Sequence, residues 1–165
     1  MTLFSRLANY LIDLAAKRPP DFIIGEPDAP YLLRWWLIPR NRFFNLYLHQ
    51  FLRSDDPRAL HDHPWVNCSI LLRGSYYETT PRATYYRKAG QVVLRRGTSA
   101  HRIELCRSNV REDSPVLPAW SLFITGPVTR EWGFHCPQGW RHWKDFTSYR
   151  EVGEDGRGRI GRGCE

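Results

Sequence analysis

Short runs of aromatic and β-branched residues, separated by Gly, Pro, Asn and Asp, make up most of the sequence after position 20. Runs this short and this closely spaced are typical of an antiparallel β-sandwich or β-barrel, whereas βαβ units would need helical patterns between them. Gly74 and Gly90 fall between consecutive runs, where hairpin turns favour glycine. We therefore expect an all-β, mainly antiparallel domain. Its ten predicted strands cover residues 22–24, 31–38, 43–52, 65–72, 75–80, 84–87, 91–95, 101–106, 120–125 and 131–135.

A helical pattern precedes these runs. Apolar residues recur at helical spacing at Leu3, Leu7, Tyr10, Leu11 and Leu14. Thr2 can cap the start of such a helix, and Pro19 and Pro20 end it because proline lacks the amide hydrogen. The sequence predicts one amphipathic helix over residues 1–18, packed on the outside of the β-domain.

Length and composition set the domain boundaries. A chain of 165 residues, of which 42% are hydrophobic, has the size and the core material of one domain. We assign residues 1–152 to a single domain, with the helix at 1–18 and the β-barrel at 22–150. Residues 153–165 contain five glycines among charged residues, a composition that cannot bury apolar surface. A flexible Gly/Arg tail is expected there.

The sequence shows neither an apolar run long enough for a membrane helix nor the pattern of a secretory leader. We therefore expect a cytoplasmic protein without a membrane partner. Its four cysteines, Cys68, Cys106, Cys136 and Cys164, form no CxxC pair and no regular framework. Reduced thiols are the expectation for such a chain.

The net charge points to an anionic partner. Lys and Arg outnumber Asp and Glu by 24 to 17, which gives a net charge of +7, and the excess belongs to the body because the tail is neutral. A basic body favours a small anionic molecule. The neutral tail argues against a nucleic-acid partner. The sequence leaves open whether the protein forms a homodimer.

The chemistry of the chain concentrates at the sequence His61-Asp62-His63. Positions i and i+2 of a strand face the same way, so both imidazoles can bind one metal ion. His101 begins a later run and can supply a third imidazole. Three neutral imidazoles suit a divalent transition metal, with Fe expected first and Zn, Ni or Cu as alternatives. If the pair lies in a loop instead, both histidines only cap local turns through Asp62 and Pro64.

The spacing of these residues resembles the two sequence motifs of the cupin superfamily. The first motif, an HxH pair followed by a Glu position and a later Gly, corresponds to residues 61–68 and Gly74. The second motif, a Gly, a PxG turn and a third His, corresponds to Gly90, residues 95–97 and His101. The resemblance covers about residues 43–135.

The chain departs from the cupin pattern in three ways. Arg95 replaces the proline of the turn, and His101 comes one residue late. The Glu position holds Asn67 or Cys68, depending on the spacing counted, and a cysteine in this region resembles the thiol dioxygenases, which use three histidines and no carboxylate. Glu78, on the following run, is a candidate for the missing carboxylate ligand. Asn67, Cys68 and Glu78 are therefore all candidate extra ligands or pocket residues.

A second resemblance is to small, mostly uncharacterised cupin-like proteins of bacterial and phage genomes. It rests on Leu48-His49 and on residues 53–56 and 130–134. This resemblance implies no particular activity.

The resemblance to cupins implies a jelly-roll barrel, the double-stranded β-helix, with a metal bound by His61, His63 and His101. The leading functional implication is a three-histidine, metal-dependent enzyme of the dioxygenase-like type, acting on a small anionic substrate. One alternative is a non-catalytic cupin that binds a small ligand such as a nucleotide. Another is a metal-free sugar-nucleotide epimerase or isomerase, in which a histidine base needs a carboxylate partner.

The remaining candidate residues surround the histidine pair. His49 lies on the preceding run and is a candidate general base. Tyr47 faces the same side of that run, and Trp65 follows His63 by two positions. Arg73 offers a guanidinium group to an anion. We expect Tyr47, Trp65 and Arg73 to line the substrate pocket.

Overall fold

The computed structural model of the chain describes residues 2–26, 28–109, 111, 114–147 and 163–165. Six antiparallel strands form the largest sheet, in the spatial order β1-β2-β3-β10-β5-β8. β10 pairs with both β3 and β5, so a strand from late in the chain joins the two halves of this sheet. The strands are β1 (Phe22–Glu26), β2 (Ala29–Trp36), β3 (Asn45–Phe51), β10 (Ala119–Thr125), β5 (Asn67–Arg73) and β8 (Val92–Arg95).

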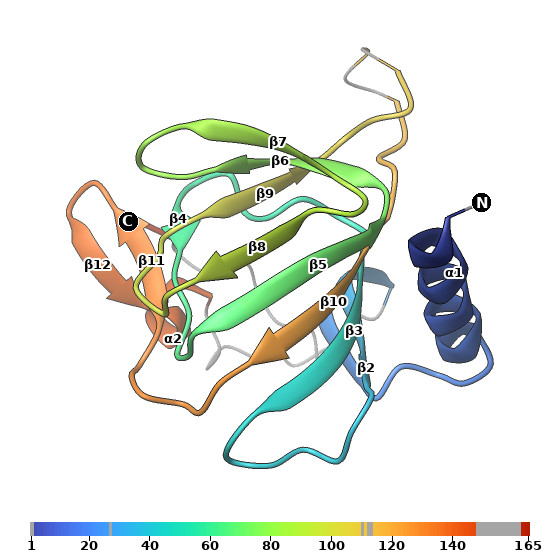
Figure 1. Cartoon of the computed structure of the whole chain (residues 1–165). Helices are drawn as coiled ribbons and strands as arrows, with labels where there is room; N and C mark the ends of the chain where they lie inside the picture. The colour runs from blue at the N-terminus through green and yellow to red at the C-terminus, as the bar shows by residue number, and fades with distance from the viewer. Residues whose placement is uncertain (1, 27, 110, 112–113, 148–162) are drawn as a thin grey trace.

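Two three-stranded sheets complete the β-domain, in the orders β7-β6-β9 and β12-β11-β4 (Figure 1). Inner side chains of the large sheet pack with side chains of β6 and β9 in one apolar cluster, formed by Leu32, Phe51, Leu71, Tyr76, Ile103, Leu105 and Ala119. The large sheet and the sheet of β6 therefore face each other across a common interior. The strands are β4 (Leu60–His61), β6 (Ser75–Thr79), β7 (Thr84–Lys88), β9 (Arg102–Leu105), β11 (Gly133–Cys136) and β12 (Gly139–His142).

The expectation of an all-β, mainly antiparallel domain with an N-terminal helix is confirmed. Each of the ten predicted runs overlaps a strand, and the structure adds β4, β12 and the short helix α2 (Trp143–Phe146), which the sequence did not predict. Neither helix within the described ranges has the length and apolar character needed to span a membrane.

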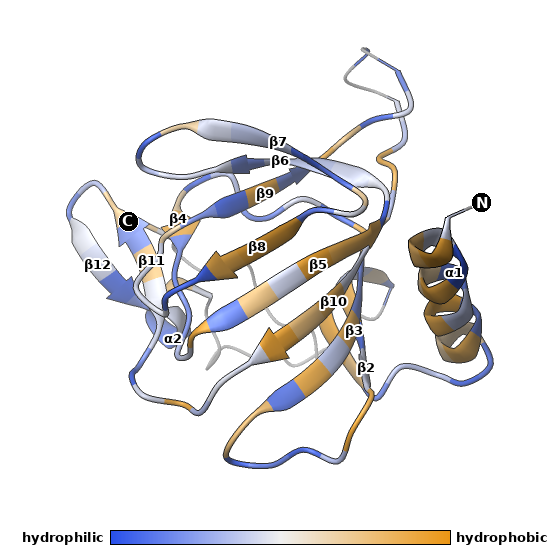
Figure 2. Cartoon of the chain, in the orientation of Figure 1, coloured by the Kyte–Doolittle hydropathy of each residue, from blue (hydrophilic) through white to orange (hydrophobic). Residues whose placement is uncertain are grey.

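The N-terminal helix α1 (Leu3–Ala16) packs on the outer face of the large sheet, and Leu11 is the one predicted apolar residue that contributes to this contact. Its buried side chains are Ala8, Ile12 and Ala15, whereas Leu3, Leu7, Tyr10 and Leu14 are exposed. The surface beneath the helix includes the stacked rings of Trp35 and Trp120, 5.4 Å apart, and Ala8, Ile12 and Ala15 pack against it. Figure 2 shows that apolar residues surround much of the helix, which explains why the pattern did not identify the buried side.

A β-bulge in β5 changes the direction of Arg73. Trp120 of β10 pairs with Arg73, but the next residue of β10, Ser121, pairs with Leu71, so Leu72 is the extra residue. The bulge turns Arg73 to the outer face, where it is exposed and its Nη2 donates to Asn9 Oδ1 of α1 at 2.7 Å. The prediction that Arg73 lines the substrate pocket is therefore wrong.

The end of the chain is attached to the domain. Cys136 at the end of β11 forms a disulfide with Cys164, which corrects the expectation of four reduced thiols, while Cys68 and Cys106 are free. The Gly163 amide donates to the Phe146 carbonyl at 3.2 Å. The last three residues of the predicted tail are thus bound to α2, β11 and β12, and residues 153–162 lie outside the described part of the chain.

Candidate metal centre

Backbone pairing brings three histidines from two segments to one place. His61 ends β4, and it exchanges both backbone hydrogen bonds with His101 at 2.9 Å. The His63 amide donates to the Gly97 carbonyl at 2.9 Å, which ties the segment after β4 to the turn before His101. That turn, at residues 96–99, accommodates the late position of His101 in the sequence.

The side chains of His61, His63 and His101 converge. Each offers one ring nitrogen, and these atoms lie within 4.8 Å of one another. The Nε2 atoms of His63 and His101 are 2.9 Å apart. Two nitrogens bound to one ion at 2.0–2.1 Å and at a right angle would be about 2.9 Å apart, so this spacing suits a transition metal. No second group of three such side chains occurs among the described residues.

Burial keeps two of these imidazoles neutral. It lowers the pKa of His61 to about 4, although the nearby Asp55 carboxylate opposes the shift. Burial, together with the neighbouring His61 and His101, holds the pKa of His63 well below its usual value. Neutral imidazoles have a free lone pair at pH 7, which is the form that binds a metal ion.

Glu78 is buried on β6, behind His101. Its Oε1 is 3.1 Å from His101 Nδ1 and accepts a 2.7 Å hydrogen bond from Arg95 Nε, while Oε2 accepts from Arg87 Nε at 2.8 Å. Burial opposes ionisation, but the contacts with His101 and Arg95 lower the pKa of Glu78 to about 2. The ionised carboxylate lies beside Nδ1, which makes no hydrogen bond, while the Nε2 atom of the ring faces His63. Because both of its oxygens are engaged, Glu78 is placed to orient His101 rather than to serve as a further ligand.

Asp55 faces the Nδ1 atom of His61. The distance from Asp55 Oδ2 to that nitrogen is 3.6 Å, which is longer than a hydrogen bond. The carboxylate is fixed by the Ile103 amide, which donates to Oδ2 at 2.6 Å, and by the Tyr31 hydroxyl, which donates to Oδ1. The sequence did not indicate this position for Asp55, because only the folded register brings residue 55 next to residue 61.

Asp62, between the two paired histidines, points away from them. Its buried carboxylate accepts the Gly133 amide at 2.8 Å and the Trp140 indole N–H at 3.1 Å, and lies 2.9 Å from Arg130 Nη1. Asp62 therefore ties the HxH segment to β11 and β12, which fixes the backbone that carries His61 and His63.

The other predicted site residues lie around this centre. Tyr47, His49 and Asn67 are buried on the inner face of the large sheet, and the ring centroids of Tyr47 and His49 are 5.8 Å apart. Trp65 stacks on His63 at a centroid distance of 6.4 Å. Cys68 is half-buried and, by strand alternation, faces away from Asn67. Neither Asn67 nor Cys68 belongs to the group of three close ring nitrogens.

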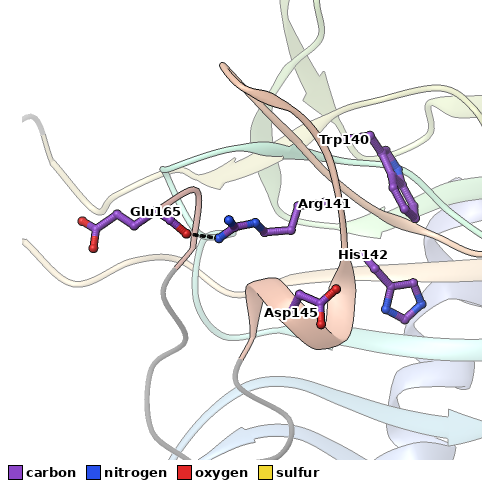
Figure 3. Close-up of a pocket in the computed structure, with 5 residues that line it drawn as sticks. All are labelled: Trp140, Arg141, His142, Asp145 and Glu165. Carbon is purple, nitrogen blue, oxygen red and sulfur yellow. Dashed lines mark hydrogen bonds between the residues drawn. The ribbon is translucent and has the colours of Figure 1, made fainter.

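A surface pocket lies elsewhere, on β12 and α2 (Figure 3). Its volume is about 530 Å³, and it is lined by Trp140, Arg141, His142, Asp145 and Glu165. Arg141 donates to the backbone carbonyl of Glu165 at its edge. None of the three converging histidines lines this pocket, so it is separate from the candidate metal centre.

Comparison with known proteins defines the fold. No protein-family model matches the sequence, and no curated protein matches it. A DMSP lyase from Ruegeria pomeroyi is similar in structure, with 12% identity over 84% of this chain and 72% of its own, and a TM-score of 0.56. A cupin-2 domain protein from Rhodospirillum rubrum has 15% identity over 72% of this chain and 76% of its own, and a TM-score of 0.53. The chain has the cupin fold, the double-stranded β-helix.

Proposed function

We propose that the protein is a metal-dependent cupin enzyme in which His61, His63 and His101 hold a divalent transition metal. Iron is the metal that we expect at this site. The observation that supports this most strongly is the arrangement behind the ligands. Glu78 contacts the outer nitrogen of His101, and Asp55 faces the outer nitrogen of His61. Carboxylates in these positions are typical of metal-binding histidines, because they fix the tautomer and the orientation of the ring.

The reaction that we propose is of the oxygenase type, on a small anionic substrate. A metal with three protein ligands supplies open positions at which substrate and dioxygen can bind. The chain contributes orientation and exclusion of water: the Glu78 carboxylate lies 3.1 Å from His101 Nδ1, and the aromatic rings of Trp65 and Phe123 lie beside His63.

The metal content of the purified protein tests this proposal. We expect stoichiometric iron, measured by elemental analysis after purification without chelator, and loss of that metal in a His63→Ala variant that keeps its far-UV spectrum. A His142→Ala variant is the matched control, because His142 lies on β12 outside the centre and should leave the metal content unchanged. Full metal content in His63→Ala would contradict the proposal. Oxygen uptake with candidate carboxylate substrates then tests the reaction type.

One observation supports a second candidate function, a metal-free isomerase or epimerase. His101 has the carboxylate partner, Glu78, that a histidine base needs. Against it, the Nε2 of His101 lies 2.9 Å from His63 rather than free for a substrate. Activity that survives metal removal would favour this second function, whereas a nucleotide that co-purifies with metal-free, inactive protein would favour a binding module.

A further inference from the structure

Helix α1 carries a second stripe of apolar side chains, apart from the side that packs on the sheet. Leu3, Leu7, Tyr10 and Leu14 are 83%, 55%, 63% and 44% exposed. None of the four belongs to the apolar cluster beneath the helix. Large apolar side chains that gather on one exposed stripe, rather than singly, indicate a surface that binds a partner.

The spacing of this stripe indicates that the partner is another helix. Its residues are four, three and four positions apart, which is the alternation of a coiled-coil seam. Such a seam is narrow and fits along a helix with the same pattern. Among the described residues α1 is the one helix longer than a single turn, because α2 has only four residues. A matching stripe is therefore available on α1 of a second copy of this chain.

A two-fold axis across the seam sets the register of two such helices. If the helices run antiparallel, Leu7 of each copy faces the partner's Tyr10. In the same register Leu3 faces the partner's Leu14, so large apolar side chains fill every layer of the seam. Both copies then use the same surface, as a closed dimer requires.

The charges beside the seam favour the antiparallel direction. Arg6 and Asp13 are exposed, lie seven residues apart on the same edge of the stripe, and have no ion-pair partner among the described residues. In the antiparallel register Arg6 of each copy lies beside the partner's Asp13, which gives an ion pair at each end of the dimer. In a parallel pair Arg6 would lie beside the partner's Leu11 instead. Charge complementarity therefore points to an antiparallel pair of identical helices.

The β-domain leaves room for a second helix beside α1. At about 100° per residue, the stripe lies roughly 140° around the helix from the centre of the buried side chains Ala8, Ile12 and Ala15. Two copies joined along the stripe therefore hold their β-domains pointing away from each other. Because α1 packs on the outer face of the large sheet, this contact is separate from the candidate metal centre.

We propose that α1 pairs antiparallel with α1 of a second copy of this chain, along the stripe of Leu3, Leu7, Tyr10 and Leu14, to form a two-fold symmetric homodimer. Two helices of 14 residues make a smaller contact than the roughly 1,200 Å² that a stable complex buries. The dimer is therefore weak, and we expect a monomer at about 5 µM and a dimer at about 500 µM. Chemical unfolding at about 5 µM then reports on the monomer.

Sedimentation equilibrium of the full-length, metal-free protein between about 5 and 500 µM tests this inference. We expect Leu7→Gln to weaken dimerisation at least about tenfold, because it places an amide in the centre of the seam. Leu94→Gln is the matched control and should change the affinity less than about twofold, since Leu94 is a leucine of β8 that is 76% exposed and lies outside the stripe. Far-UV spectra show whether both variants fold.

Charge reversal tests the direction of the two helices. Arg6→Asp places like charges beside each other at both ends of the antiparallel dimer and should weaken it about tenfold. Adding Asp13→Arg to this variant restores both ion pairs, so the affinity should return to within about twofold of the wild type. Since the two residues are seven positions apart and do not contact each other within one helix, a role inside the monomer would give no such recovery.

Several results would overturn the inference: a wild-type protein that stays monomeric at about 500 µM, unchanged affinity in Leu7→Gln, no recovery in the double charge variant, or an equal loss in Leu94→Gln. A monomeric protein that binds vesicles of phosphatidylcholine and phosphatidylglycerol through Leu7 would assign the stripe to a membrane surface and counts as the first of these results. The wild-type measurement decides the matter even if a variant does not fold. Failure here is separate from failure of the metal proposal, which the iron content of His63→Ala decides.

Discussion

Glu78 lies between two arginines of the barrel wall and one histidine of the candidate metal centre. Its buried carboxylate contacts His101, Arg95 and Arg87 at once. A glutamine in its place would keep the shape but lose the charge, so the orientation of the His101 ring would no longer be fixed.

We expect Glu78→Gln to weaken metal binding by about 10- to 100-fold, the usual effect of losing the carboxylate behind a ligating histidine. Competition with a chromophoric chelator measures this affinity. Glu104→Gln is the control, since Glu104 is an exposed glutamate on the neighbouring strand β9 and should leave the affinity unchanged. Equal affinities of Glu78→Gln and the wild type would show that Glu78 does not orient a metal ligand.

Helix α1 has two apolar sides, and only one of them packs on the sheet. The small residues Ala8 and Ala15 allow the helix to approach the tryptophan pair, and Ile12 fills the space between them. Leu7 lies outside this packed side and is exposed.

Shortening a side chain should affect the free energy of unfolding differently on the two sides of the helix. We expect Ile12→Ala to lower the free energy of unfolding by about 2–4 kcal/mol, because Ile12 is 5% exposed and its removal leaves a cavity against the sheet. Leu7→Ala should change it by less than about 0.5 kcal/mol, because Leu7 is 55% exposed. Urea denaturation measures both values. A larger effect of Leu7→Ala would mean that the helix packs through the face predicted from the sequence.

Acid should destabilise the metal-free fold as a whole. His61 has a pKa of about 4 in the folded protein and about 6.5 when unfolded, so between these values the unfolded chain binds the extra proton. The free energy of unfolding therefore falls as the pH is lowered from 6.5 to 4, by about 3 kcal/mol for this group. Glu78, with a folded pKa of about 2, adds a further loss as the pH falls from about 4.5 to 2.

Urea unfolding of the chelator-treated protein at pH 7.0, 5.5 and 4.5 measures whether the free energy of unfolding falls with pH in this way. The His61→Gln variant should show a weaker dependence on pH over the same range. Equal stability at pH 7.0 and 4.5 would mean that His61 is not held neutral by burial.

The sequence predicted those features that depend on local pattern. Strands follow from short apolar runs with turn residues, and the three histidines follow from the i, i+2 spacing and the distance to the second turn. The partner Asp55 could not be predicted in this way, because it faces a histidine that only strand pairing brings close. Arg73 was misplaced because a single extra residue, the bulge at Leu72, reverses the alternation.

The central place of β10 has a consequence for how the protein is synthesised. Until β10 is made, the large sheet consists of two separate parts, β1-β2-β3 and β5-β8, each with an open edge. Thirty residues separate the end of β8 at Arg95 from the end of β10 at Thr125. At roughly 5–20 residues per second, the two completed parts coexist unpaired for roughly 1.5–6 s on every nascent chain. During that interval the strands that carry Arg34, His49 and Asn67 have no common interior, so their inner faces cannot yet be buried against one another.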